Sequence, residues 1–245
     1  MNSEKKSIEV CFSPALYRFF GNKESIVVVV DILRATSSVC TAFKNGVKEL
    51  IPVGTIEEAL QFKEKGYTVA AERDGKVLDF ADFGNSPDNF SPENVEGKCV
   101  VYSTTNGTQT IQMAADEAYK VVIGAYLNIS VLYKWLVKQN RDIVILCAAW
   151  KNKFNIEDSL FAGALSEKLM KSGKYTSICD SAAVAMDLWA MARKNPIKYL
   201  DKAAQRWRLK KLELDYVIPF CHTRDIADVI PVYEDGRIVN KGKQV

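Results

Sequence analysis

Two polar stretches of the sequence each follow an apolar run and each open a segment with helical periodicity. The first, residues 31–38, reads D-I-L-R-A-T-S-S and ends the β-branched run SIVVVVD, which is typical of a strand buried on both faces. In open α/β sheets ligands bind at the carboxyl ends of strands, where the N–H groups of a starting helix attract anions. Arg34 can grip an oxyanion with two donors, and Thr36 and Ser37 add hydroxyls. This stretch predicts an anion site; the alternative is that Asp31 and Thr36 only cap the helix.

The second stretch, residues 103–108, reads S-T-T-N-G-T and follows the strand-like run KCVVY. Gly107 permits close approach of the backbone to a ligand. The G-K-[ST] ending of a Walker P-loop is absent, so the stretch is not a nucleotide-binding motif of that kind. Its donors are neutral, which suits orientation of a substrate more than chemistry. The predicted substrate-binding residues here are Thr104, Thr105, Asn106, Gly107 and Thr108.

Two further stretches carry polar residues that could reach the same crevice. Glu157 and Asp158 follow the apolar run DIVILC and open a predicted helix, where they can favour the helix dipole or hold a hard cation such as Mg²⁺. The motif G-N-S-P lies in an irregular connection over residues 74–97, and long connections of this kind are often functional. From this region and the strand before it, the predicted substrate-binding residues are Arg73, Asn85 and Ser86.

The composition excludes several classes of function. The net charge of +3 over 245 residues is too small to favour nucleic acid. The densest basic stretch, residues 206–211, is interpreted as a solvated helix face, with a site for an anionic ligand as the alternative. A single histidine, His222, cannot supply the several imidazoles of a zinc hydrolase, and no G-x-S-x-G elbow accompanies it. Phosphatase signatures of the D-x-D and C-x5-R types are absent at Asp31, Cys40 and Cys147.

The sequence also predicts where the protein resides. No run approaches the ~18 apolar residues that a membrane span needs, and the first residues, MNSEKKSIEVCF, lack the apolar stretch of a signal peptide. The six cysteines are widely spaced and form no C-x-x-C pair. We therefore expect a cytoplasmic protein with reduced cysteines and no membrane partner.

The hydrophobic pattern alternates between strands and helices, which predicts an α/β fold. We expect a three-layer α/β/α arrangement with a mixed, largely parallel sheet, as one domain over residues 1–245 or as two fused α/β lobes. The predicted strands cover residues 25–31, 48–53, 67–72, 98–102, 120–123, 142–146, 216–220, 228–232 and 237–239. The predicted helices cover residues 36–44, 55–66, 108–118, 130–139, 156–172, 181–194 and 197–209.

Four motifs in this order resemble the 2-phosphosulfolactate phosphatases, the ComB family. They are V-V-V-D-I-L-R-A-T-S-S, G-N-S-P, S-T-T-N-G-T and I-E-D-S-L-F-A-G, and the later F-C-H-T-R-D-I-A-D-V-I-P-V is also similar. The likeness extends from about residue 7 to about residue 232. It implies Mg²⁺-dependent hydrolysis of 2-phospho-3-sulfolactate to 3-sulfolactate and phosphate, a step of coenzyme M synthesis in methanogens. It also implies an α/β fold unrelated to the usual phosphatase folds, and a homodimer.

The residues agree physically with such a small anionic substrate, which carries both a phosphate and a sulfonate. Arg34, Arg73 and Lys151 can act as counter-charges, and Mg²⁺ would neutralise phosphoryl oxygens and activate a water. Asp31, Arg34, Glu157 and Asp158 are the predicted catalytic residues, and the three carboxylates are hypothesised to include the metal ligands and the group that orients the water. Two alternatives remain: a phosphatase for another small phosphorylated carboxylic acid, and a non-catalytic anion-binding protein on the same fold.

Overall fold

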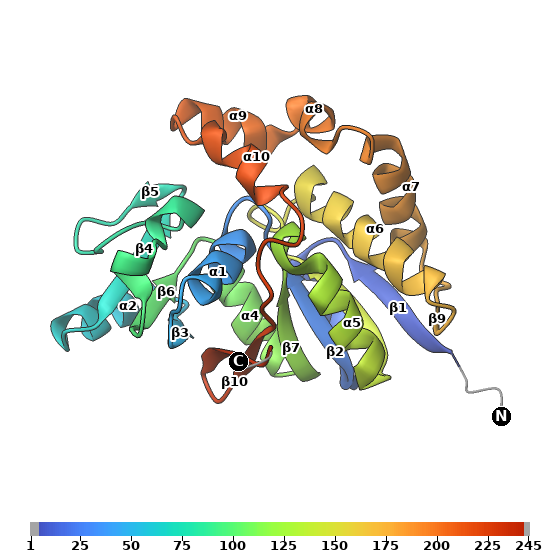
Figure 1. Ribbon diagram of the computed structural model, residues 1–245, viewed down its shortest axis with the longest axis horizontal. Helices are drawn as coiled ribbons and strands as arrows, with labels where there is room; N and C mark the ends of the chain where they lie inside the picture. The colour runs from blue at the N-terminus through green and yellow to red at the C-terminus, as the bar shows by residue number, and fades with distance from the viewer. Residues whose placement is uncertain (1–4, 243–245) are drawn as a thin grey trace.

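The centre of the molecule is an 11-stranded mixed sheet, seen in a computed structural model that describes residues 5–242 (Figure 1). The strand order is β5-β4-β6-β3-β11-β10-β7-β2-β8-β1-β9. Most neighbouring strands are parallel; the exceptions are the pairs that involve β5, β10 and β11. The strands are β1 Lys6–Cys11, β2 Asn22–Val30, β3 Glu49–Pro52, β4 Thr68–Arg73, β5 Lys76–Val77, β6 Cys99–Ser103, β7 Ala118–Gly124, β8 Ile143–Cys147, β9 Tyr175–Thr176, β10 Pro231–Glu234 and β11 Arg237–Asn240.

Helices connect the strands and cover the sheet, which confirms the predicted three-layer α/β fold with a largely parallel sheet. The α-helices are α1 Ala35–Lys44, α2 Ile56–Glu64, α3 Pro92–Val95, α4 Gly107–Ala115, α5 Ile129–Gln139, α6 Ile156–Lys171, α7 Asp180–Ala192, α8 Pro196–Tyr199, α9 Ala204–Lys211 and α10 Ile218–Cys221. Short 3-10 helices are η1 Pro14–Phe19, η2 Pro87–Asn89, η3 Tyr126–Asn128, η4 Leu200–Lys202 and η5 Asp215–Val217. The single domain over residues 1–245 stays a prediction.

Strand β2 lies in the middle of the sheet, between β7 and β8. Its last six residues, positions 25–30, are all buried, as the continuous β-branched run predicts for a strand with neighbours on both edges and layers on both faces. Burying a valine side chain stabilises the fold by roughly 1.5–3 kcal/mol, so the four valines of this run anchor the core. The residue that follows, Asp31, is therefore held at the end of a fully buried stretch of strand.

Two helical connections cross the same part of the sheet in opposite directions. The first runs from β2 through α1 to β3, and the second runs from β6 through α4 to β7. In the sheet β2 pairs with β7 and β6 pairs with β3, while the antiparallel hairpin β10–β11 fills the space between β3 and β7. Both helices must cross this centre, which brings their first turns together at the ends of β2 and β6.

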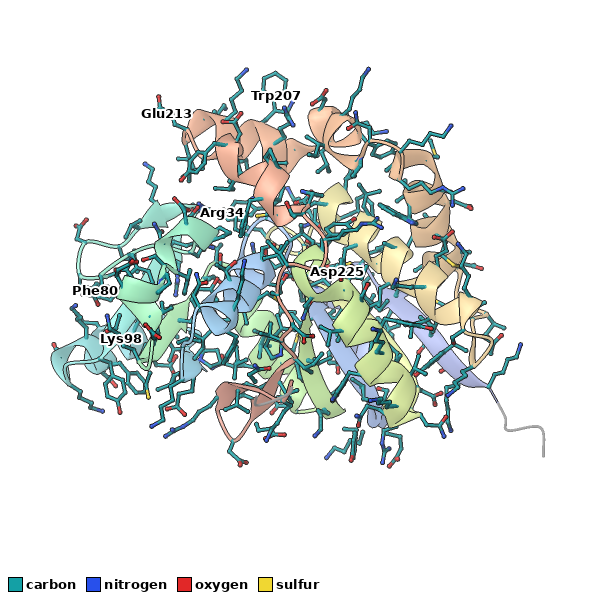
Figure 2. The ribbon with its side chains drawn as sticks, viewed as in Figure 1. Arg34, Phe80, Lys98, Trp207, Glu213 and Asp225 are labelled. Atoms are coloured by element: carbon teal, nitrogen blue, oxygen red, sulfur yellow. The ribbon has the colours of Figure 1, made fainter. Side chains whose placement is uncertain are left out.

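Residues 180–221 pass over this edge of the sheet. From α7 the chain continues through α8 and α9 to α10, and these helices form an arch along the end of the molecule in Figure 1. The arch places α9 above the turn that carries Arg34, as Figure 2 shows. Segments far apart in sequence thus enclose the end of β2.

The sequence prediction was wrong in two segments of this arch. Residues 216–220 were predicted as a strand but form η5 and α10, because Pro219 sits in the first turn of a helix that buries Ile218 and Cys221. Residues 197–209 were predicted as one helix but form α8, η4 and α9, because Ala203 is extended and ends the first part.

Strand β1 was missed entirely, although it pairs with β8 inside the sheet.

The helix predicted from residue 55 is confirmed as α2. Thr55 and Glu58 form a capping box at the start of α2, with the Thr55 hydroxyl accepting from Glu58 N at 3.1 Å and Glu58 accepting from Thr55 N at 3.1 Å. All six cysteines are unpaired. None of the helices within residues 5–242 has the length and apolar character that crossing a membrane requires.

Candidate active site

The two polar turns predicted from the sequence lie against each other. A Cβ atom added at Gly107 would lie 2.8 Å from Ala35 Cβ and 3.2 Å from Asp31 Oδ2. The Tyr102 hydroxyl donates to the Ala35 carbonyl at 3.2 Å, which ties the end of β6 to the start of α1. The first turn therefore fills the space beside Gly107. The N-termini of α1 and α4 lie next to each other.

Both turns border a narrow cleft that is open to solvent on one side. The structure brings six of the predicted site residues to its walls: Asp31, Arg34, Asn85, Thr105, Asn106 and Glu157. They come from four separate segments of the chain, namely the β2–α1 turn, the loop before η2, the β6–α4 turn and the start of α6. The four stretches of the sequence thus border the same cleft.

Arg34 is a buried cation that lines this cleft. Its side chain is only 5% exposed, and within residues 5–242 it has no ion pair and donates no hydrogen bond. Burying an unpaired guanidinium costs several kcal/mol, so a fold keeps one only where a ligand repays the cost. With the N-termini of two helices opening beside it, Arg34 is placed to receive an oxyanion.

Asp158 joins the first turn to the loop after β8. Its Oδ1 accepts from Ile32 N at 2.8 Å, and its Oδ2 accepts from Ala149 N at 3.3 Å and from Asn155 Nδ2 at 2.8 Å. The residue is fully buried and does not line the cleft. Because three N–H donors already occupy its oxygens, Asp158 fixes the geometry of the site more readily than it binds a ligand.

Three buried oxygen atoms that face the site have no partner among the described residues. They are Glu157 Oε2, Asn155 Oδ1 and Asn85 Oδ1, and all three residues line the cleft. Leaving one buried polar atom unsatisfied costs roughly 1–3 kcal/mol. All three atoms are acceptors, so the ligand that satisfies them must bring positive charge or hydrogen-bond donors.

The electrostatics of the buried carboxyls also favour a ligand that brings positive charge. Burial raises the pKa of Asp31 well above its ordinary value, and the neighbouring Asp158 raises it further. Burial raises the pKa of Glu157 to about 7 and, together with the charge on Glu157, raises the pKa of Asp158 to about 8. Ionising all three at once is unfavourable without a cation, and raised carboxyl pKa values of this kind cluster at functional sites.

These groups fit Mg²⁺ but not a cage made wholly of protein ligands. Within residues 5–242 no three side chains of His, Cys, Asp and Glu are arranged around one metal position. Mg²⁺ is commonly held by only one or two carboxylates and completes its shell with waters and substrate phosphate. Asp31 and Glu157, with the free amide oxygen of Asn155, supply such a partial set of hard oxygen ligands.

Glu72 is a site residue that the sequence reasoning passed over in favour of its neighbour Arg73. Glu72 is buried and accepts from Thr105 N at 2.8 Å, from the Thr105 hydroxyl at 3.1 Å and from Gly75 N at 2.6 Å, so it holds the second turn in place. Arg73 does not line the cleft; its guanidinium donates to Ser103 Oγ at 3.0 Å and to the Glu72 carbonyl at 2.6 Å. Side chains alternate along a strand, and this alternation is the signal that separates the two residues.

A second group that the sequence reasoning did not place here comes from the arch. Gln205 and Arg208 of α9 line the cleft, and Arg208 stacks on the Trp150 ring with its guanidinium carbon 4.5 Å from the ring centroid. Asn155, just ahead of α6, was also missed. Its place two residues before Glu157, at a helix N-cap, is a signal that the sequence contained.

The remaining predicted residues are buried within the turns and do not line the cleft. The Thr36 hydroxyl accepts from Asp31 N at 3.1 Å, and the Ser37 hydroxyl donates to the Ile32 carbonyl at 2.9 Å. Thr104 and Thr108 bond to each other across the start of α4, and Ser86 lies next to Asn85. These side chains shape the two turns instead of facing the cleft.

The chain was compared with known proteins. The model of a family described as 2-phosphosulpholactate phosphatase matches residues 11–236. A protein of Caldanaerobacter subterraneus named probable 2-phosphosulfolactate phosphatase is 37% identical over 218 residues, which cover 87% of this chain and 90% of the relative. Relatives with the same name from Thermotoga petrophila and Clostridium beijerinckii are 34% and 33% identical, and the matches cover 87% and 88% of this chain and 91% and 92% of the relatives.

The matched region contains both polar turns, the G-N-S-P motif, the start of α6 and the α9 segment, so every wall of the cleft lies within it. The family match covers well over half of the chain, and the relatives exceed 30% identity along most of their own length. The chain with this buried arginine, carboxylate cluster and paired helix N-termini belongs to the 2-phosphosulpholactate phosphatase family.

Proposed function

We propose that this protein hydrolyses 2-phospho-3-sulfolactate to 3-sulfolactate and inorganic phosphate, with Mg²⁺ as its cofactor. The observation that carries the proposal is Arg34, a buried and unpaired guanidinium at the meeting point of two helix N-termini and beside Asp31 and Glu157. A phosphate monoester brings the dianionic oxygens that this arrangement lacks. The names of the relatives support the choice of substrate, and a role in coenzyme M-type sulfonate metabolism is part of the same proposal.

In this proposal Arg34 binds the phosphoryl oxygens, and the dipoles of helices α1 and α4, which both begin beside it, favour the negative charge of the phosphoryl group. Phosphoryl transfer has little covalent chemistry for a protein to perform, so fixed positive charge around the transferred group supplies most of the rate. Glu72 and Asp158 do not touch the substrate; they hold the second and first turns rigid by accepting four hydrogen bonds from backbone N–H groups. The walls of the cleft restrict water to the open side.

Asp31, Glu157 and Asn155 would hold the cation, because their oxygens line the cleft and are not all used by protein donors. When bound, Mg²⁺ would neutralise phosphoryl charge and make a water more nucleophilic. Asp31 keeps one oxygen on Ala35 N at 3.3 Å, which orients the carboxylate at the start of α1. Asp158, which the sequence also placed among the ligands, serves here to orient Asn155. Its Oδ2 accepts a hydrogen bond from Asn155 Nδ2 at 2.8 Å.

Removal of the metal tests this proposal directly. We expect the purified protein to release phosphate from 2-phospho-3-sulfolactate, to stop after treatment with EDTA, and to recover when Mg²⁺ is restored in excess of the chelator. The same titration with Ca²⁺ is the control, because Ca²⁺ takes more ligands at longer distances and should restore little activity. Undiminished phosphate release in EDTA would remove Mg²⁺ from the mechanism, and no release under any condition would refute the phosphatase.

We also propose that the protein is cytoplasmic and forms a homodimer. Its six unpaired cysteines support a reducing compartment. On and just before α7, Ile178, Val184 and Met191 are 102%, 48% and 68% exposed, and an apolar outer helix face of this kind favours a protein interface. Sedimentation should give twice the mass of one chain, and Met191→Lys should shift it towards the monomer; a wild-type protein that sediments as a monomer at high concentration would contradict the dimer.

A further inference from the structure

The α9 segment carries the densest basic stretch of the sequence, and one of its residues behaves differently from the rest. Trp207 is 61% exposed, and Lys210 and Lys211 are exposed as well, as expected for a solvated helix face (Figure 2). Arg206 pairs with Asp201 at 3.3 Å on the surface. Arg208, in contrast, is half-buried and lines the cleft.

The Arg208 side chain is fixed from two sides. Trp150 covers one face of its guanidinium, and Arg208 Nε donates to Gln205 Oε1 at 2.6 Å. The other end of the same amide donates from Gln205 Nε2 to the Leu33 carbonyl at 2.9 Å. Gln205 is buried, so one rigid side chain links Arg208 to the turn that carries Arg34.

This fixation leaves the outer nitrogens of Arg208 free. Within residues 5–242 its Nη1 and Nη2 atoms donate no hydrogen bond, and no carboxylate oxygen lies within 4.0 Å of the guanidinium. Arg34 and Arg208 are the two cationic side chains that line the cleft in the described part of the chain. The nearby Lys151 is already neutralised by Asp74 at 2.8 Å, which leaves two guanidinium groups for two oxyanions.

We propose that Arg208 is the specificity-determining residue that binds the second oxyanion of the substrate, the sulfonate or carboxylate remote from the phosphoryl group. The inference rests on the proposed function, in which Arg34 and the paired helix N-termini take the phosphoryl group. A stacked guanidinium with two free parallel donors matches the oxygens of a sulfonate or carboxylate. The link through Gln205 sets the separation between the two anion sites, so the site selects small substrates that carry both groups.

Kinetics with three substrates distinguish this role from others. Arg208→Gln should lower kcat/KM for 2-phospho-3-sulfolactate by about 10- to 100-fold, mainly through KM, because charge-assisted hydrogen bonds of this kind contribute about 1.5–3 kcal/mol. 2-Phospholactate lacks the sulfonate, and the phosphate ester of 2-hydroxyethanesulfonate lacks the carboxylate. The variant should lose on the ester that retains the group bound by Arg208 and equal the wild type on the other.

The matched control is Arg206→Gln, which removes the same charge two residues away on the same helix but outside the cleft. It should leave all three kcat/KM values within about twofold, since exposed charges contribute little. Arg208→Lys should recover only part of the loss, because it keeps the charge but not the forked donors. An equal loss on all three substrates, or no loss on any, would overturn the inference.

Binding of the product separates this inference from the proposed function. If the wild type hydrolyses none of the three esters, the phosphatase proposal fails, and calorimetry with 3-sulfolactate then decides on Arg208. Binding of 3-sulfolactate to the wild type that weakens at least tenfold in Arg208→Gln, with an unchanged melting temperature, would support the oxyanion site. Equal affinity in both proteins, or no binding to the wild type, would overturn it.

Discussion

Replacement of Asp31 by Asn should abolish phosphate release while the protein stays folded. The amide keeps an oxygen that can accept from Ala35 N, so the turn at the start of α1 retains its hydrogen bond. It removes a negative charge that Asp158 and burial already make unfavourable, as the raised pKa of Asp31 indicates. In the proposed mechanism it also removes one of two carboxylates available to Mg²⁺. We expect kcat to fall by about a thousandfold or more.

The two effects of this substitution have opposite signs, which makes the test specific. The melting temperature in EDTA should be equal to or above that of the wild type, because like-charge repulsion is relieved. The stabilisation that Mg²⁺ gives to the wild type should be lost, since binding to the folded state is what raises the melting temperature. Asp235→Asn, which neutralises an exposed carboxylate in the turn between β10 and β11, is the control and should match the wild type in both measurements. Retention of more than a tenth of the wild-type kcat would remove Asp31 from the mechanism.

Local physical chemistry made the strands and helices around the site predictable. The run SIVVVVD can bury both of its faces only inside a sheet, and β2 occupies such a place. The capping box at Thr55 and Glu58 specifies the start of α2 within its own four residues. Predictions of this kind need only neighbours in sequence, and they held wherever neighbours in sequence decide the conformation.

The prediction for the arch failed because contacts with residues distant in sequence decide its conformation. Residues 216–220 contain Tyr, Val, Ile and Phe, which favour strands, yet they pair with no strand of the sheet that the structure describes. The burial of Val217 and Ile218, and Pro219 in the first turn, decide for η5 and α10. Tertiary packing overrides propensity in such short segments, and the sequence does not contain that packing in readable form.

The site residues also fall into two groups, those that could be predicted from neighbours in sequence and those that could not. Asp31, Arg34, Thr105, Asn106 and Glu157 were predictable because each follows a strand, and strand ends at one edge of a sheet converge. Arg208 and Gln205 follow no strand, and they reach the cleft only because the chain from α7 to α10 returns over the edge. Convergence of that kind depends on the path of the arch, which periodicity cannot supply.

Arg34→Gln should have the second large effect, and it probes charge in place of metal binding. The glutamine can still donate to one phosphoryl oxygen, but it offers neither the positive charge nor the fork of two parallel donors. Because the guanidinium is 5% exposed and unpaired within the described chain, its charge faces whatever the cleft binds. Removing a charged donor of this kind typically costs about 10²- to 10³-fold in kcat, and we expect a loss in that range.

The stability of this variant gives a second readout. An unpaired buried cation destabilises the unliganded fold, so Arg34→Gln should raise the melting temperature in phosphate-free buffer. Inorganic phosphate should stabilise the wild type and leave the variant unchanged, because the site that binds the anion has lost its charge. Arg34→Lys should fall between the two in activity, and Arg18→Gln, at an exposed position on η1, should match the wild type throughout. If phosphate stabilised Arg34→Gln as strongly as the wild type, the phosphoryl group would bind elsewhere in the cleft, and Arg34 would be a structural residue of the β2–α1 turn.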